Sequence, residues 1–368
     1  MKKVTLISIW ADPSYYINLL FLINYLIKKK QKVILICKSI DNIKNFYYFV
    51  EKSSDLEIKI IKNNSRIGMI EFFFKKLYYV IKFRPSKIIS INFISLFFTV
   101  ILKFFLKYIY IIYYNFDFNI SKNLKINNNI EKLIINLTNV IFIPSHSRAK
   151  LYKKIYKFKG EIFPFYNCFS KNFKPKKELL SKKFSRKKIF IRLGSYNEGH
   201  NLEELIRSTK YWKKNCILIM AGISHNNYLD KLIKIKKKLR LSKVTIMEKV
   251  TYNMWFKLLN NAYAGFALYQ PINISHKNMA GTSQKLNNYF FYNKPAIVTK
   301  STDFIKFNQK FKTLLLVNSS SENDIARKVN ELSINKIKYR KLKKNTLNVF
   351  NNFFNFEKQV LQVSKILD

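Results

Sequence analysis

The residues best suited to chemistry lie in a short polar loop, Gly281-Thr282-Ser283, which Lys285 follows closely. The loop opens an expected helix, and a helix N-terminus leaves backbone N–H groups free to face a ligand. The helix dipole adds partial positive charge at the same point. The stretch therefore predicts an anion site. The alternative is an ordinary connection, because such loops recur in every doubly wound sheet.

Two carboxylates are candidates for acid–base chemistry. Asp12 follows the expected strand Val4 to Ile9, and Asp117 follows the expected strand Tyr108 to Tyr114. Ligands bind at the carboxyl ends of strands in open α/β sheets, so either residue could be a catalytic base or hold a sugar hydroxyl. Each could instead be a cap or turn residue. Three histidines could contact substrate or serve as surface or capping residues: His146, His200 and His276.

Strand and helix patterns alternate along the first half of the chain, which favours a Rossmann-like α/β domain. An amphipathic helix is expected from about Tyr15 to Lys29, followed by a strand at Lys32 to Cys37. The glycine fingerprint of dinucleotide sites is missing after the first strand, so no dinucleotide is predicted.

The apolar stretch Phe93 to Tyr114 is almost long enough to span a membrane. Lys103 and Lys107 interrupt it, and charges near the middle of a span are costly. We therefore favour a helix from Phe93 to Lys107 followed by a buried strand. The aromatic residues of this stretch then pack in the core, or form a basic, apolar face that rests on a bilayer.

A polar, lysine-rich segment from Phe169 to Arg186 has the composition of a linker. A second alternation begins after it with the expected strand Lys188 to Leu193. Further strands are expected at Cys216 to Ala221 and at Ala296 to Thr299. The chain is expected to close with one long helix from about Lys338 to Leu367.

The composition narrows the classes of partner. The formal net charge is +47 with 48% hydrophobic residues, so a large core is available and an anionic surface would attract the chain. Lysine far outnumbers arginine and is spread throughout. Nucleic-acid binding instead needs clustered lysine and arginine in a recognisable module, and arginine is favoured where phosphates or bases are bound by paired hydrogen bonds. We therefore expect the positive charge to reflect a position near a membrane together with compositional drift, and we do not expect a nucleic-acid partner. Three distant cysteines favour a reducing cytoplasm and neither a disulfide framework nor a metal site.

Motifs of the second half resemble the GT-B glycosyltransferases, in particular the large group 1, or family 4, set. Ile191 to Gly194 is similar to the family's first strand and phosphate loop, and Leu218 to Gly222 to its second strand and glycine turn. Lys285-Leu286 with Lys294 to Ile297 is similar to the family's donor-side signature. Asn288 stands where that family has a donor-binding glutamate, and an amide can still bond to a ribose hydroxyl.

The resemblance implies a GT-B fold, in which two Rossmann-like βαβ domains face across a cleft and a C-terminal helix returns to the first domain. The acceptor domain would cover residues 1–168, a linker 169–187, the nucleotide-sugar domain 188–345 and the returning helix 346–368. The residues expected to bind the donor are Arg192, Gly194, Ser195, Gly222, Gly281, Thr282, Ser283, Lys285 and Asn288.

The implied function is transfer of a hexose from a nucleotide-diphosphate sugar to a glycan or lipid-linked acceptor in bacterial surface polysaccharide synthesis, such as capsule, O-antigen or lipopolysaccharide. The enzyme would be cytoplasmic, at the inner face of the membrane, retaining, and without cofactor or metal, because cations and a helix N-terminus can neutralise the departing diphosphate. The alternatives are a nucleotide-sugar epimerase on the same fold, an inactive homologue, and a protein that binds anionic surfaces through its charge.

Overall fold

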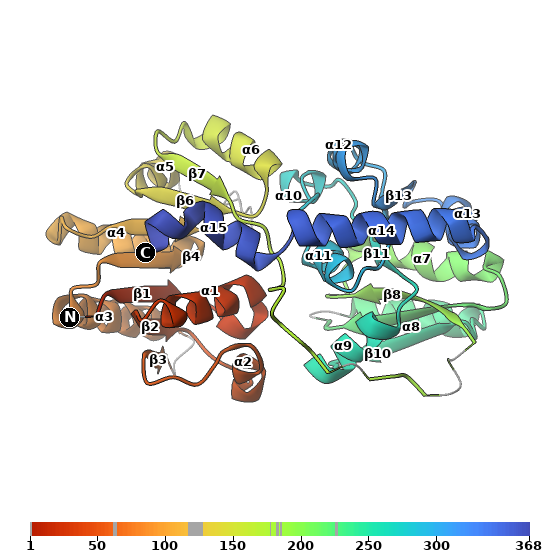
Figure 1. The fold of residues 1–368 in the computed structure, drawn as a ribbon, viewed down its shortest axis with the longest axis horizontal. Coiled ribbons are helices and arrows are strands. Elements are labelled where there is room, and N and C mark those ends of the chain that lie inside the picture. Colours follow the sequence, from red (N-terminus) through yellow and green to blue (C-terminus); the bar gives the residue numbers. More distant parts are fainter. Residues whose placement is uncertain are drawn as a thin grey trace. The chain divides into compact units, whose positions relative to one another are not determined.

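The computed structural model describes residues 2–61, 65–116, 128–176, 178–181, 184, 186–224 and 227–368. They form two compact units (Figure 1). Unit 1 consists of Met1–Asn167 with Phe356–Asp368, and unit 2 of Cys168–Asn355. The last segment of the chain thus belongs to the same unit as its beginning.

Among the described residues, unit 1 is built on a parallel seven-stranded sheet in the order β3-β2-β1-β4-β5-β6-β7. Its strands are β1 (Val4–Ile9), β2 (Lys32–Cys37), β3 (Leu56–Ile60), β4 (Lys87–Ile91), β5 (Ile111–Tyr114), β6 (Val140–Ile143) and β7 (Glu161–Pro164). Its helices are α1 (Ile17–Lys28), α2 (Ile43–Phe49), α3 (Arg66–Phe83), α4 (Asn92–Phe105), α5 (Asn128–Asn136), α6 (His146–Tyr156), α15 (Phe356–Leu367) and the short 3₁₀ turn η1 (Pro13–Tyr15).

Both faces of this sheet are covered, as parallel sheets require. Helices α3 to α6 pack on one face through a buried cluster that includes Phe72, Leu96 and Tyr152. On α1, Phe21 lies 6.1 Å from Phe49 and 5.7 Å from Phe356 of α15, measured between ring centroids. The apolar stretch after β4 is split into α4 and β5, which confirms the helix-plus-strand interpretation.

In the part of unit 2 that is described, a parallel six-stranded sheet has the order β10-β9-β8-β11-β12-β13. Its strands are β8 (Lys188–Leu193), β9 (Cys216–Gly222), β10 (Val244–Glu248), β11 (Ala264–Ala267), β12 (Ala296–Thr299) and β13 (Leu314–Val317). Its helices are α7 (Leu202–Ser208), α8 (Tyr228–Lys238), α9 (Tyr252–Asn261), α10 (Ile274–Lys277), α11 (Gln284–Phe291), α12 (Thr302–Phe311), α13 (Glu322–Ile334) and α14 (Lys336–Asn352), with 3₁₀ turns η3 (Glu198–His200) and η4 (Thr209–Tyr211).

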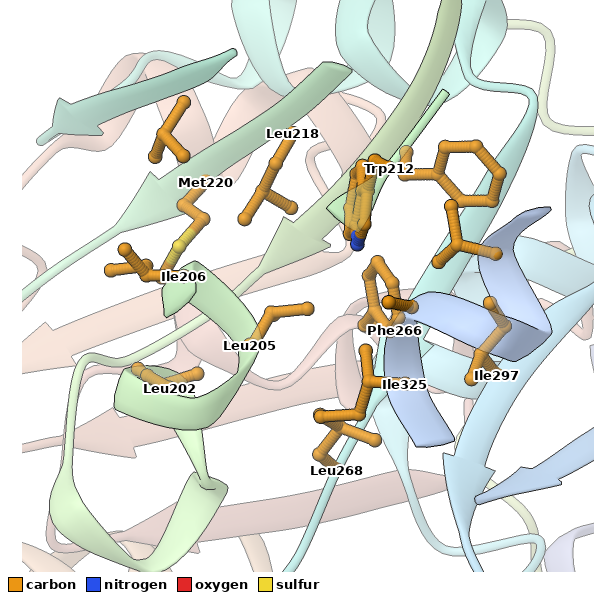
Figure 2. Packing of buried hydrophobic residues seen from close by; sticks show 14 of the residues in the cluster. Leu202, Leu205, Ile206, Trp212, Leu218, Met220, Phe266, Leu268, Ile297 and Ile325 are labelled. Carbon is orange, nitrogen blue, oxygen red and sulfur yellow. The ribbon is translucent and has the colours of Figure 1, made fainter. Parts of the chain in front are cut away.

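The core of unit 2 lies between this sheet and helices α7, α8 and α13. Figure 2 shows Trp212 and Phe266 at its centre, with leucine and isoleucine side chains of α7 nearby. Trp212 lies 5.3 Å from Phe190 of β8 between ring centroids. This packing fixes β8, β9 and β11, whose carboxyl ends carry the polar residues described below.

The end of the chain differs from the sequence-based expectation of one long helix. Helix α14 ends at Asn352 and α15 begins at Phe356. The buried Asn355 amide donates to the carbonyls of Phe350 at 2.6 Å and of Asn351 at 3.1 Å. A side chain that bonds these carbonyls competes with helix continuation, and no glycine or proline marks the break in the sequence.

Two further features were missing from the sequence-based expectation. Helix α12 and strand β13 follow β12 and complete the second sheet. The segment expected to be a linker begins with aromatic residues that pack inside unit 2, where Phe169 stacks on Phe291 with ring centroids 4.6 Å apart. Within the described ranges, no helix combines the length and apolar character needed to cross a bilayer.

Candidate functional site

Arg192, near the end of β8, organises the loop that follows this strand. Only 2% of its surface is exposed. Its guanidinium donates to the carbonyls of Gly194 at 2.5 Å and Ser195 at 2.6 Å, and to Nδ1 of His200 at 2.7 Å. Nδ1 must accept this bond, so the imidazole carries its proton on Nε2. The loop after β8 is therefore folded around the Arg192 side chain.

Two glycines allow the backbone to approach closely at this loop. Gly194 has a φ of +120°, and a Cβ there would lie 2.6 Å from Cε of Lys285. A Cβ on Gly222 would lie 1.8 Å from the carbonyl oxygen of Gly194. The first glycine makes room for the Lys285 side chain, and the second lets the ends of β8 and β9 touch.

The N-terminus of α11 meets the same loop. Ser283 caps the helix by accepting from the backbone N–H of Leu286 at 3.3 Å. Its hydroxyl also bonds to the hydroxyl of Tyr269 at 2.6 Å. Asn287 steadies the preceding turn by donating to the carbonyl of Gly281 at 2.9 Å. The helix start is thus held against the carboxyl end of β11, which Tyr269 follows closely.

Lys285 extends from the first turn of α11 over Gly194. Its ammonium lies 3.5 Å from the Tyr269 hydroxyl and 5.0 Å from the centre of that ring. Burial, together with the positive charge of Arg192, holds the pKa of Lys285 well below its usual range. The described partners of Lys285 and Arg192 are carbonyls, a hydroxyl and an imidazole, none of which is a carboxylate.

Two histidines complete this group. The rings of His200 and His276 stack with centroids 5.8 Å apart, and His200 lies 5.3 Å from the Tyr269 ring. Burial lowers the pKa of His200, and the charges of Lys285 and Arg192 lower it further. His200 is therefore neutral near neutral pH. Among the described residues, the site combines the Arg192 guanidinium, a lysine whose protonated form an anion would favour and a capped helix N-terminus, with no carboxylate partner for either side chain. This combination favours an anion that carries several oxygen acceptors.

The residues expected to bind the donor are largely brought together. Arg192, Gly194, Ser195, Ser283 and Lys285 meet at the ends of β8 and β11, and Gly222 supports them from β9. Gly281, with a φ of +78°, and Thr282 form the turn before α11. Asn288 lies further along α11 and is 2% exposed.

The two predicted catalytic carboxylates belong to the first half of the chain. Asp12 is buried and accepts from the backbone N–H of Ser14 at 2.8 Å, from its hydroxyl at 2.6 Å and from the N–H of Asp41 at 2.7 Å. It thus organises the loop after β1, and its catalytic role stays a prediction. Asp117 lies outside the described residues. His146 is the first residue of α6.

Tyr269 belongs to the site but is not among the residues expected from the sequence. Its hydroxyl joins the helix cap to the Lys285 ammonium, and its ring faces both histidines. Its place just after a buried strand was the available signal, because polar groups at the carboxyl ends of parallel strands line ligand sites.

The sequence matches no family profile, and no curated protein matches it. Solved structures match over nearly the whole chain. HepE of Anabaena, determined with UDP and glucose, has a TM-score of 0.74 at 11% identity and covers 99% of each chain. Sucrose-phosphate synthase of Thermosynechococcus elongatus has a TM-score of 0.74 at 15% identity, over 100% of this chain and 98% of that one. A Listeria monocytogenes protein named as a UDP-N-acetylglucosamine 2-epimerase has a TM-score of 0.68 at 11% identity, over 99% and 96%.

These identities are low, so the likeness concerns architecture. This chain has two parallel sheets with helices on both faces, and its final helix joins the first unit. The structural match to the neighbours covers 98–99% of their chains. The chain therefore has the GT-B fold.

Proposed function

We propose that this protein is a glycosyltransferase that uses a nucleotide-diphosphate sugar as donor. The observation that carries the proposal is the pairing of Arg192 and Lys285 beside the capped start of α11, where the part of the chain that the structure describes places no carboxylate against them. A diphosphate would supply the missing negative charge. HepE binds UDP and UDP-glucose on the same fold, which supports this donor class.

In the proposed reaction, the bond between the anomeric carbon and the diphosphate oxygen breaks, and the acceptor hydroxyl oxygen bonds to that carbon. Lys285 and the N–H groups at the start of α11 stabilise the charge that develops on the departing diphosphate. Arg192 holds the Gly194-Ser195 loop in place for this contact. Asp12 and Asp117 remain the candidates to take the acceptor proton. We propose a reaction without a metal, because these side chains can neutralise the charge on the departing diphosphate. The resemblance of the second-half motifs to group 1 transferases leads us to propose further that the reaction is retaining.

The proposed acceptor is a glycan or lipid-linked glycan in bacterial surface polysaccharide synthesis, at the inner face of the membrane. The resemblance of the second-half motifs to group 1 transferases and the net charge of +47 support this role.

The donor site can be tested by titrating UDP into the wild type and into Lys285→Ala. We expect the variant to bind UDP at least tenfold more weakly, because a hydrogen bond to a charged group contributes about 1.5–3 kcal/mol. Lys237→Ala removes an exposed lysine in the last turn of α8, at the edge of the sheet opposite the carboxyl ends of β8 and β11, and serves as the matched control with unchanged affinity. Equal affinities for all three proteins would contradict the site.

Turnover distinguishes the candidate functions. A transferase cleaves one donor from a panel of UDP-, GDP-, ADP- and CMP-sugars only when membrane extract supplies an acceptor. A nucleotide-sugar epimerase remains the alternative, because the Listeria neighbour carries that name. Such an enzyme would convert the donor sugar into its epimer without any acceptor. UDP binding without either reaction would identify an inactive homologue.

A further inference from the structure

The outer face of α3 in unit 1 is apolar where a surface helix is normally polar. Ile67, Ile70, Phe74, Tyr78 and Ile81 are 67%, 56%, 60%, 53% and 57% exposed. Their spacing of three or four residues aligns them along one side of the helix. We call these five residues the outer stripe.

The opposite side of α3 is packed into the domain. Phe72 and Val80 are fully buried there. So is Lys76, whose ammonium donates to the carbonyl of Ser95 on α4 at 2.8 Å and whose pKa burial holds well below its usual range. A lysine thus faces inward while isoleucine and phenylalanine face water. The outer stripe is not the leftover edge of a core, because the helix already has a complete inner face.

Helix α4 continues the apolar surface. Phe98 of α4 packs against Phe73 of α3 with ring centroids 5.5 Å apart, so the two helices lie side by side. Near the end of α4, Phe104 and Phe105 are 66% and 78% exposed. Tyr108 is half exposed and donates to the carbonyl of Val80 on α3 at 3.4 Å. These aromatic residues therefore lie beside the C-terminal end of the outer stripe.

The border of this surface is basic. Lys82 is exposed, and its ammonium lies 3.0 Å from the Tyr78 hydroxyl. Arg66 and Lys107 are also exposed. The acidic residue of α3, Glu71, is paired with Lys75 at 2.7 Å. A second copy of this chain would bring lysine against lysine and +47 against +47. Charge complementarity instead selects an anionic partner that also accepts apolar side chains.

We propose that the outer stripe of α3, with the exposed aromatic residues of α4, docks on the surface of an anionic lipid bilayer. The helix lies in the interface, the apolar side chains enter the acyl boundary and the lysines contact the headgroups. With 18 residues, α3 presents about 27 Å of such surface. The inference concerns unit 1 and does not depend on the donor site of unit 2.

The test is co-sedimentation of the full chain with vesicles of phosphatidylcholine containing 30% phosphatidylglycerol, beside vesicles of phosphatidylcholine alone. We expect the wild type to bind the anionic vesicles and a Phe74→Gln/Ile81→Gln double variant to bind them at least tenfold more weakly. Ile337→Gln, at an 81% exposed isoleucine of α14, is the matched control and should bind like the wild type.

Circular dichroism and UDP affinity establish that each variant is folded, since the changed side chains are exposed and lie outside the donor site. Unchanged UDP affinity with lost vesicle binding supports the docking surface even if no transferase activity is found. Equal vesicle binding by the double variant overturns the proposal. So does a wild-type dimer in sedimentation velocity that the double variant abolishes while vesicle binding persists.

Discussion

At the scale of single residues, the site depends on where positive charge is buried. Arg192 satisfies three of its donors with loop atoms, so it stabilises a backbone shape as much as it supplies charge. Lys285 has weaker partners, with its ammonium 3.5 Å from a tyrosine hydroxyl. An ammonium that burial disfavours gains most from an incoming anion. We therefore infer that Arg192 is the positioning residue and Lys285 the ligand-binding residue.

The close contact between Gly222 and Gly194 predicts the effect of one added methyl group. Gly222→Ala would place Cβ against the Gly194 carbonyl, which itself accepts from Arg192. We expect a loss of about 1–3 kcal/mol in the free energy of unfolding, as overpacking costs, together with weaker UDP binding. Urea unfolding and UDP titration measure the two effects.

Gly160→Ala in unit 1 is the control for Gly222→Ala. Its Cβ would lie 2.7 Å from the Phe158 ring and 3.0 Å from the Asn139 carbonyl oxygen, so any overpacking there stays within unit 1, outside the β8 loop. This variant should leave UDP affinity unchanged. Wild-type affinity in Gly222→Ala would show that the β8 loop tolerates displacement and would contradict the importance of the glycine contact.

At the scale of elements, the turn between α11 and β12 fixes the helix that carries Lys285. Lys294 in this turn donates to the carbonyl of Asn260 at the end of α9 at 2.9 Å. Burial, with a smaller contribution from Lys343, lowers the pKa of Lys294 from 10.5 to about 8. The protonated form is thus disfavoured in the folded protein relative to the unfolded chain.

This lowered pKa predicts a pH dependence of stability. The stabilisation due to Lys294 is fully present above pH 10.5 and is lost as pH falls through about 8. Relative to Lys294→Met, the wild type should gain stability between pH 8 and 10. The gain is about 3 kcal/mol at most, and less because the side chain keeps some contact with water. Urea unfolding of both proteins across this range measures it, and parallel curves would refute the assignment.

At the scale of the whole molecule, positive charges far outnumber negative charges. The chain has 68 lysine and arginine residues against 21 aspartate and glutamate residues. Self-repulsion of this kind destabilises a compact state, and salt screens it, since the Debye length falls to about 10 Å at 0.1 M. Exposed ion pairs such as Lys28–Glu51 add little to the free energy of unfolding and do not offset this repulsion.

We therefore expect the melting temperature to rise when NaCl is increased from 10 to 300 mM. If the free energy of unfolding of unit 1 or unit 2 rises by about 1 kcal/mol, the melting temperature of that unit rises by roughly 2–4 °C, which calorimetry resolves. Potassium chloride at the same ionic strength should give the same rise, because screening depends on ionic strength and not on the identity of the cation. A melting temperature that falls with salt would indicate that attractive ion pairs outweigh the repulsion.

The sequence by itself determined most local elements. Apolar runs such as Val4 to Ile9 and Lys188 to Leu193 became strands, and the loop Gly281-Thr282-Ser283 opened α11, because these signals lie within a few neighbouring residues. Features without such a signal were missed, as with the break that Asn355 introduces before α15.

Only the tertiary structure decided which lysines reach the candidate site and which lysine side chains are buried. Sheet order brings the end of β8 to the start of α11, and so places Lys285 over Gly194. In α3, packing against α4 places Lys76 inside the domain and leaves Phe74 60% exposed, although the two residues are only two positions apart in the chain. Burial and the distance between charges depend on residues remote in the chain, so a sequence pattern cannot report them.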